Sequence, residues 1–142
     1  MKSRFYAILA TAVLLLIAGC AATKPSSADL SDEEITKLLI GKWDLSEKEG
    51  LRSTTGFDLF RADGTFSSEA LVEYTGNRYR GTRVSGKWKV LDGNLVETIE
   101  TSEPPVHDKG TVYRLKVLNV TATQLVTEGA GGVIVARKRL AN

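Results

Sequence analysis

The chain has 142 residues and a formal net charge of +2, and its length predicts one folded domain rather than two. Lys2 and Arg4 account for that charge, because without them the basic and acidic residues are equal in number. This balance argues against a nucleic-acid partner, which normally requires a basic surface. The single cysteine cannot form a disulfide within the chain, so packing of the core must stabilise the domain.

Residues 1–19 have the proportions of a secretory signal peptide. Lys2 and Arg4 precede an apolar run of about fourteen residues, which ends in small residues just before Cys20. The run is shorter than the roughly 20 residues that a permanent membrane-spanning helix needs. We therefore expect an exported protein.

The order Ile17-Ala18-Gly19-Cys20 closely resembles the lipobox of bacterial lipoproteins. The resemblance implies that the Cys20 thiol receives a diacylglyceryl group, that cleavage precedes Cys20, and that the new amine is acylated, for example with palmitate. Two or more acyl chains anchor a protein stably to a membrane. In the family, aspartate after the cysteine commonly signals retention in the inner membrane, so Ala21 implies the outer membrane, facing the periplasm. In a host with one membrane, the same anchor would hold the domain on the outer surface. The alternative is an ordinary signal peptide that ends in a cysteine by chance.

Residues 20–30 are expected to form the lipidated cysteine and a short flexible tether, because the segment is mostly small and polar. The folded domain is expected over residues 31–142. It opens on a capping-box pattern, with Ser31 three residues before Glu34, and Gly41 ends the apolar stripe that follows. The pattern predicts a helix of about two turns, too short to be stable alone, that covers one end of the domain.

From Lys42 onward the apolar period changes to two, with turn residues between the segments. Asp63-Gly64 and Asp92-Gly93 are typical of tight hairpins. Strands that follow one another so closely pair as antiparallel neighbours, and closure of the sheet removes its two exposed edges. The predicted fold class is all-β: an eight-stranded antiparallel up-and-down barrel preceded by one short helix. The strands are expected over residues 42–48, 56–61, 65–74, 81–90, 95–101, 111–118, 124–127 and 133–139.

Alternation along these strands predicts which side chains face inward. Trp88 and Tyr113 share their strand faces with apolar residues, whereas basic residues occupy the opposite faces. Phe57 and Leu59 are out of phase with Phe60. That segment therefore requires either a bulge or a strand that is apolar on both faces.

Three short motifs resemble lipocalins and the smaller lipocalin-like domains of bacteria. They are Gly41-Lys42-Trp43 after a short helix, residues 60–66 around Asp63-Gly64, and residues 86–95 around Trp88. The resemblance covers roughly residues 31 to 140 and implies a calycin-type barrel. It also implies that an arginine of the last strand covers Trp43 at the closed end through a cation–π contact. Arg137 or Arg139 could supply this contact, and we name Trp43 and Arg137 as the structural pair.

The residue types give little support to catalysis or metal binding. His107 is the only histidine, so neither a histidine metal cluster nor a Ser-His-Asp triad is available. It lies in a polar loop beside Pro104-Pro105, where we expect a solvated side chain. No pair of carboxylates stands out as the pair that a glycosidase requires. We expect a protein without enzymatic activity, cofactor or metal.

Two functions from different classes remain open. In the first, the barrel binds a small apolar or amphipathic ligand. In the second, the barrel is filled and its loops bind another envelope protein, through the Pro104-Pro105 loop and the turn between Tyr74 and Arg80. An empty interior of a few hundred Å³ would favour the ligand, and an apolar patch on the loops would favour the protein partner.

The candidate ligand-binding residues combine inward aromatic rings with charged groups near the mouth. An inward Glu97 with Arg80 would form either a structural pair or an orienting group for a ligand, because a buried charge must be paired. The complete candidate set is Trp88, Tyr113, Glu97, Arg80 and Tyr74.

Overall fold

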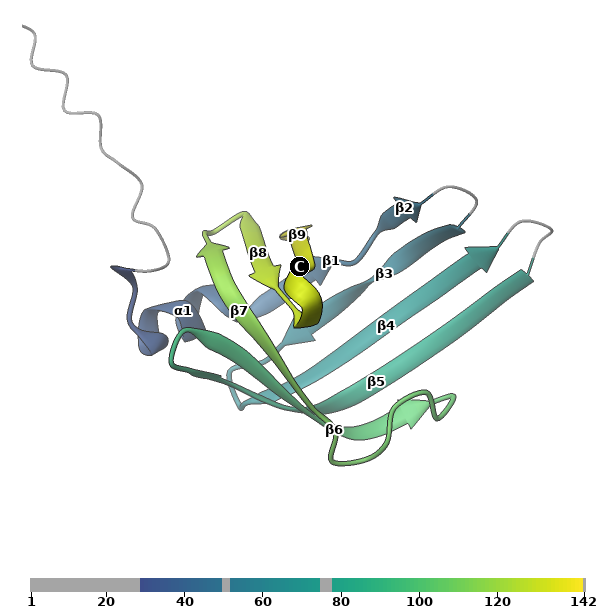
Figure 1. Cartoon of the computed structure of the whole chain (residues 1–142), viewed down its shortest axis with the longest axis horizontal. Helices are drawn as coiled ribbons and strands as arrows, with labels where there is room; N and C mark the ends of the chain where they lie inside the picture. The colour runs from purple at the N-terminus through teal and green to yellow at the C-terminus, as the bar shows by residue number, and fades with distance from the viewer. Residues whose placement is uncertain (1–28, 50–51, 75–77, 142) are drawn as a thin grey trace, which may run out of the picture.

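The computed structural model describes residues 29–49, 52–74 and 78–141 (Figure 1). The predicted signal peptide, Cys20 and the tether up to residue 28 lie outside these residues. Within them, no helix has the length and hydrophobicity of a membrane span. The elements are α1 (Asp32–Leu39), β1 (Gly41–Asp44), β2 (Glu47–Glu49), β3 (Arg52–Phe60), β4 (Thr65–Tyr74), β5 (Arg78–Leu91), β6 (Asn94–Glu103), β7 (Val112–Val120), β8 (Gln124–Glu128), the 3₁₀ turn η2 (Ala130–Gly132) and β9 (Ile134–Lys138).

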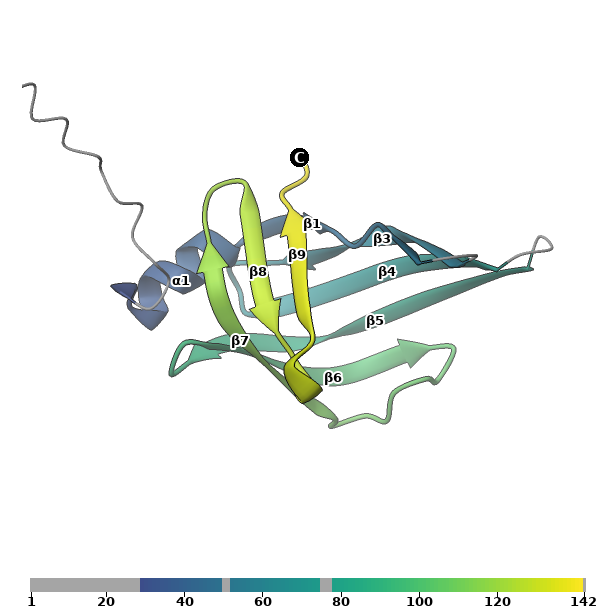
Figure 2. The same ribbon diagram turned by 45° about the horizontal axis from the view of Figure 1, so that its top comes forward.

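The strands form one antiparallel sheet whose order, β1-β3-β4-β5-β6-β7-β8-β9, follows the chain. A bridge between Trp43 and Arg139 joins the last strand to the first, so the barrel is nearly closed. The predicted eight-stranded up-and-down barrel is thus confirmed. The predicted first strand is divided, because the Asp44 carboxylate accepts a hydrogen bond from the Ser46 amide, and the continuation pairs with β3 as the separate strand β2. Figure 2 shows β7, β8 and β9 crossing the long strands β3, β4 and β5, with α1 at one end.

Strand β3 is apolar on both faces, which explains the phase conflict between Phe57 and Phe60. Its register with β4 runs without a shift from Arg52 to Phe60, so no bulge interrupts it. Phe57 faces outward, where the Lys42 ammonium lies 3.8 Å from the ring centroid. Asp58 therefore shares the inward face with Phe60.

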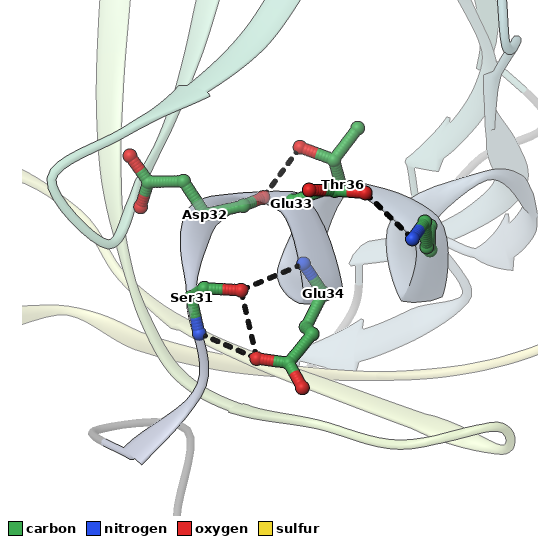
Figure 3. Close-up of polar contacts among 6 residues, drawn as sticks. Ser31, Asp32, Glu33, Glu34 and Thr36 are labelled. Carbon is green, nitrogen blue, oxygen red and sulfur yellow. Dashed lines mark hydrogen bonds and ion pairs between the residues drawn. The ribbon is translucent and has the colours of Figure 1, made fainter.

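Helix α1 begins with the predicted capping box (Figure 3). The Glu34 amide donates to the Ser31 hydroxyl oxygen at 3.3 Å, and the Ser31 amide donates to the Glu34 carboxylate at 2.8 Å. These bonds satisfy two amides that the helix itself leaves without partners. Ile35 and Leu39 form the buried face of the helix.

Asp32 ties this helix to the turn between β5 and β6. Its two carboxylate oxygens accept hydrogen bonds from the backbone amides of Asp92 and Gly93, each at 2.8 Å. The turn requires left-handed backbone at both residues, with φ of 51° and 70°. The Asp32 contacts thus hold the helix against the closed end of the barrel.

Replacing Asp32 with alanine is expected to lower the free energy of unfolding by about 1 to 2 kcal/mol, because two backbone amides lose a charged acceptor. Urea denaturation of the wild type and the variant measures the change. Glu33→Ala is the matched control, since Glu33 forms an exposed ion pair with Lys37 whose loss should cost less than about 0.5 kcal/mol. Equal losses in the two variants would contradict the anchoring role of Asp32.

The closed end of the barrel is built around Trp43, which is completely buried. Its indole Nε1 donates to the Leu39 carbonyl at 2.8 Å. The guanidinium carbon of Arg139 lies 4.2 Å from the centre of the Trp43 ring system, so the predicted cation–π contact forms with Arg139. The assignment to Arg137 was wrong, because the bridge aligns Trp43 with Arg139, and Arg137 lies two residues earlier in β9, opposite Leu125. A Cβ at Gly41, where φ is +133°, would collide with the Arg139 guanidinium, so this position requires glycine.

The hydrophobic core fills the barrel beside this end. Trp88, a predicted ligand-binding residue, belongs to this core: its ring meets Phe60 edge-on at 5.2 Å and its Nε1 donates to the Arg61 carbonyl at 3.0 Å. Within the described part of the chain, the buried residues of this core cluster lie between positions 35 and 125. They are Ile35, Leu39, Trp43, Phe60, Phe66, Trp88, Leu95, Ile99, Val117, Val120 and Leu125.

Candidate functional site

A cavity of about 190 Å³ lies inside the barrel beside the hydrophobic core. Its position follows from alternation, because each strand that lines it contributes residues from its inward face. His107 and Tyr113 stand at its solvent-exposed edge. The complete lining is Leu45, Asp58, Phe66, Ser68, Val84, Glu97, Ile99, His107, Tyr113 and Arg137.

Asp58 and Arg137 form an ion pair across this cavity. Arg137 Nε lies 3.5 Å from Asp58 Oδ2, and the two side chains are only 13% and 9% exposed. Burial raises the pKa of the Asp58 carboxyl, against the opposing effects of the Arg137 charge and a hydrogen bond with Ser68. Removal from water therefore outweighs the ion pair.

Glu97 is the third charged group of the cavity. It lies on β6 opposite Trp88 of β5 and Tyr113 of β7. Burial is the main cause that raises the pKa of the Glu97 carboxyl to about 7, and the nearby Asp58 charge adds to the effect. The positive charge of Arg137 lowers the pKa of Glu97, but by less than burial and Asp58 raise it. Near neutral pH, Glu97 is thus a carboxyl that exchanges its proton readily.

The Arg137 guanidinium uses only part of its hydrogen-bonding capacity. Within the described residues, its Nε and Nη1 atoms are buried and have no hydrogen-bond partner. The guanidinium is held by the charge of Asp58 rather than by a hydrogen-bonded fork. Buried polar groups are normally hydrogen-bonded, so this guanidinium departs from the usual pattern.

Tyr113 and His107 form the edge of the cavity. The Tyr113 hydroxyl and His107 Nδ1 are 2.7 Å apart, and the two rings meet edge-on with centroids 5.5 Å apart. This contact ties the loop between β6 and β7 to strand β7. His107, which we expected to be solvated, is half-buried at the cavity edge.

The structure unites two of the predicted ligand-binding residues, Glu97 and Tyr113, in this cavity. Trp88 instead packs in the core. The predicted pairing of Glu97 with Arg80 was wrong, because Glu97 pairs with Trp88, eight residues along β5 from Arg80 or roughly 26 Å of strand. The backbones of Arg80 and Tyr74 lie in β5 and β4, but their side chains are outside the described part of the chain.

Sequence reasoning missed Asp58 and the inward role of Arg137. A signal for Asp58 did exist in the phase conflict of its strand. If Phe60 faces inward without a bulge, then Phe57 faces outward and Asp58 must face the interior. The sequence carried no comparable signal for the separate roles of Arg137 in β9 and Arg139 just after it, because residues two apart in an extended chain share one face.

A larger hollow of about 520 Å³ lies against the opposite faces of β3, β4 and β5, where Phe57, Glu69 and Arg83 line it. Its charged side chains are solvent-exposed, so the hollow offers little electrostatic selectivity. The smaller internal cavity contains the buried charges and is the better candidate site. Among the described residues, no group of three histidine, cysteine, aspartate or glutamate side chains could hold a metal ion.

A nearly closed antiparallel barrel with a helix across one end and a cavity inside is a lipocalin-like fold. A similar solved structure is the crystal structure of a lipocalin-like protein from Bacteroides uniformis, with a TM-score of 0.50 and 17% sequence identity. The match covers 72% of this chain and 99% of that one. At this identity the similarity establishes the fold alone. No protein-family model and no curated protein matches the sequence.

Proposed function

We propose that this chain is a lipid-anchored protein of the cell envelope whose lipocalin-like barrel binds a small amphipathic molecule, without catalysis. The cavity that contains Asp58, Glu97 and Arg137 carries the proposal. Three charged groups in the interior of a small barrel cost free energy of folding, and a ligand that uses them is the natural reason to keep them.

The size of the cavity limits the ligand. A volume of about 190 Å³ corresponds to roughly six water molecules at the density of the liquid. A long lipid would not fit inside, whereas a compact polar head with a short apolar body would. Phe66, Val84 and Ile99 supply apolar contacts for such a body. The hollow interior favours ligand binding over the filled barrel that a pure interaction module would have.

A substitution that fills the cavity tests whether a ligand binds inside it. The chain from residue 24 onward, exported to the periplasm and purified gently, is expected to show an extra mass in native mass spectrometry that is lost on denaturation. Val84→Phe should abolish this mass because the larger ring occupies the cavity. Val112→Phe, at a side chain that is 49% exposed, should retain it.

An extra mass that persists in Val84→Phe would place the ligand outside the cavity and contradict the proposal. A clean mass for the wild type would favour the alternative, in which the loops bind another envelope protein. Circular dichroism and urea denaturation of each variant establish that it is folded before the masses are compared.

The anchor is tested separately at Cys20. Wild-type chain grown with labelled palmitate is expected to incorporate the label and to sediment with the outer membrane. Cys20→Ser should lose both properties, although the sequence of the barrel is unchanged in this variant. Label-free wild-type protein recovered in the soluble periplasmic fraction would instead indicate an ordinary signal peptide.

A further inference from the structure

We propose that the cavity selects a cationic ligand: a small amine whose ammonium group lies against Glu97 and whose apolar body contacts Tyr113 and Phe66. The inference rests on the proposed ligand-binding function and specifies the charge of the ligand. It follows from the balance of charges in the cavity, the accessibility of its polar atoms and the chemistry of its walls.

The cavity holds two carboxyl groups and one guanidinium. Asp58 on β3 already has Arg137 on β9 as its counter-ion, at 3.5 Å. Glu97 on β6 has no counter-ion of its own among the described residues. When Glu97 is ionised, the cavity therefore carries one uncompensated negative charge, and buried charges are stable only when paired. The other titratable groups that face it are His107 of the loop after β6 and Tyr113 of β7, which bond to each other.

A ligand cation would supply the missing charge. With an ammonium group beside Glu97, the cavity would contain two positive and two negative charges. An anionic ligand would instead add a third negative group to a cavity with one guanidinium. The unpartnered Nε and Nη1 atoms of Arg137 do not favour an anion either, because both are shielded from contact by the surrounding residues.

The apolar and aromatic walls fit the same ligand. Phe66 and Tyr113 line the cavity together with Glu97, and the faces of aromatic rings attract cations. Tyr113 is 37% exposed, so the body of a ligand can reach it from the solvent side. An uncharged alcohol would gain the apolar contacts but would leave Glu97 unpaired.

Probes that share one body and differ in charge test the proposal. Isothermal titration calorimetry near pH 7.5 would compare 2-phenylethylamine, 2-phenylethanol and 3-phenylpropionate on the chain from residue 24 onward, with butylamine, butanol and pentanoate as a second series. The amine of at least one series is expected to bind at least about tenfold more tightly than its neutral and anionic partners. Glu97→Gln should lower the affinity for the amine by about tenfold or more. Glu100→Gln, an exposed carboxyl on the same strand, should leave it unchanged.

The pH dependence gives a second readout. Because Glu97 must lose its proton to pair with the ammonium, affinity for the amine should rise by up to about thirtyfold between about pH 5.5 and about pH 8. Both probe amines stay charged over this range. The rise should disappear in Glu97→Gln.

Tighter binding of a carboxylate probe, or an amine affinity that Glu97→Gln leaves unchanged, would overturn the inference. Equal binding of all three members of a series would overturn it too, while leaving ligand binding itself intact. Absence of binding by both amines at millimolar concentration would also overturn it. The proposed ligand-binding function would then be decided independently by the native mass spectrum and its Val84→Phe control.

Discussion

Replacing Arg139 with alanine is expected to lower the free energy of unfolding by about 2 to 4 kcal/mol, a large part of the 5 to 15 kcal/mol of a typical domain. The guanidinium ties the C-terminal segment to two segments that are distant from it in the sequence. Its Nε donates to the Ala122 carbonyl at 2.6 Å, its Nη1 to the Ile40 carbonyl at 2.7 Å, and its Nη2 to the Leu38 carbonyl. Two of these carbonyls belong to the end of α1, where a helix leaves carbonyls without partners.

The ring of Trp43 beneath the guanidinium adds a cation–π contact. We place the total below the sum of the separate contacts because Arg139 is partly exposed, so water replaces some of the lost hydrogen bonds. Urea denaturation followed by tryptophan fluorescence measures the change, since Trp43 reports directly on this end of the barrel.

Arg139→Lys separates charge from geometry. Lysine keeps the cation but lacks the planar fork that reaches three carbonyls, so we expect roughly half of the loss to remain. Arg114→Ala is the matched control, because Arg114 on β7 is exposed and its loss should change stability by less than about 0.5 kcal/mol. If Arg139→Ala lowered the free energy of unfolding no more than Arg114→Ala does, Arg139 would not be what stabilises the closed end.

Glu97→Gln is expected to act in the opposite direction and to stabilise the protein at pH 8 by about 2 to 3 kcal/mol. The pKa of Glu97 rises from 4.5 to about 7 on folding, so the folded state binds the proton more tightly than the unfolded state does. Wild-type stability therefore falls as the pH rises from about 4.5 to about 7 and changes little with this group above that range. Glutamine never ionises, so the variant escapes this loss.

The same comparison near pH 4 should show almost no difference, because Glu97 is then protonated in both states. Denaturation curves at several pH values between about 4 and about 8 would reveal a gap that opens through this range. Asp58 is unchanged in the variant, and its own raised pKa would account for pH dependence that remains. Glu100→Gln serves as the control, and an equal stabilisation by it would contradict the account given for Glu97.

If Glu97 also binds an amine, it lowers the stability of the empty barrel and serves the function of the protein. The substitution that is expected to stabilise the empty barrel is the one expected to remove amine binding. Such opposition is common where a site keeps a charge that the fold alone would not favour. If Glu97 served only to stabilise the fold, replacing it would instead lower the free energy of unfolding.

Local patterns in the sequence were sufficient for the fold. Alternation with period two marked the strands, and Asp63-Gly64 and Asp92-Gly93 marked tight turns, where Gly64, Asp92 and Gly93 do adopt positive φ. Because each strand is connected closely to the next, neighbours in the chain became neighbours in the sheet. The capping box of Ser31 and Glu34 likewise depends only on residues three positions apart.

The composition of the cavity could not be predicted from local patterns, because its residues come from strands that are distant in the sequence. Asp58, Glu97 and Arg137 come from β3, β6 and β9, which meet only when the sheet closes. Their relative heights depend on the register shifts at Ser85/Gly86 and Val117/Asn119 and on the bridge that closes the barrel. A shift of two residues along β9 preserves the alternation of side chains but puts one of these two arginines, Arg137 or Arg139, in the place of the other.

The sequence by itself thus determined the strand order, the hairpins, the short capped helix and the expectation of a lipid anchor at Cys20, because each rests on residues close together in the chain. Only the tertiary structure decided which arginine covers Trp43, that Trp88 belongs to the core, and that Asp58 joins Glu97 in the cavity. The physical reason is that period-two alternation specifies the face on which a side chain lies, whereas its height in the barrel is set by closure of the whole sheet.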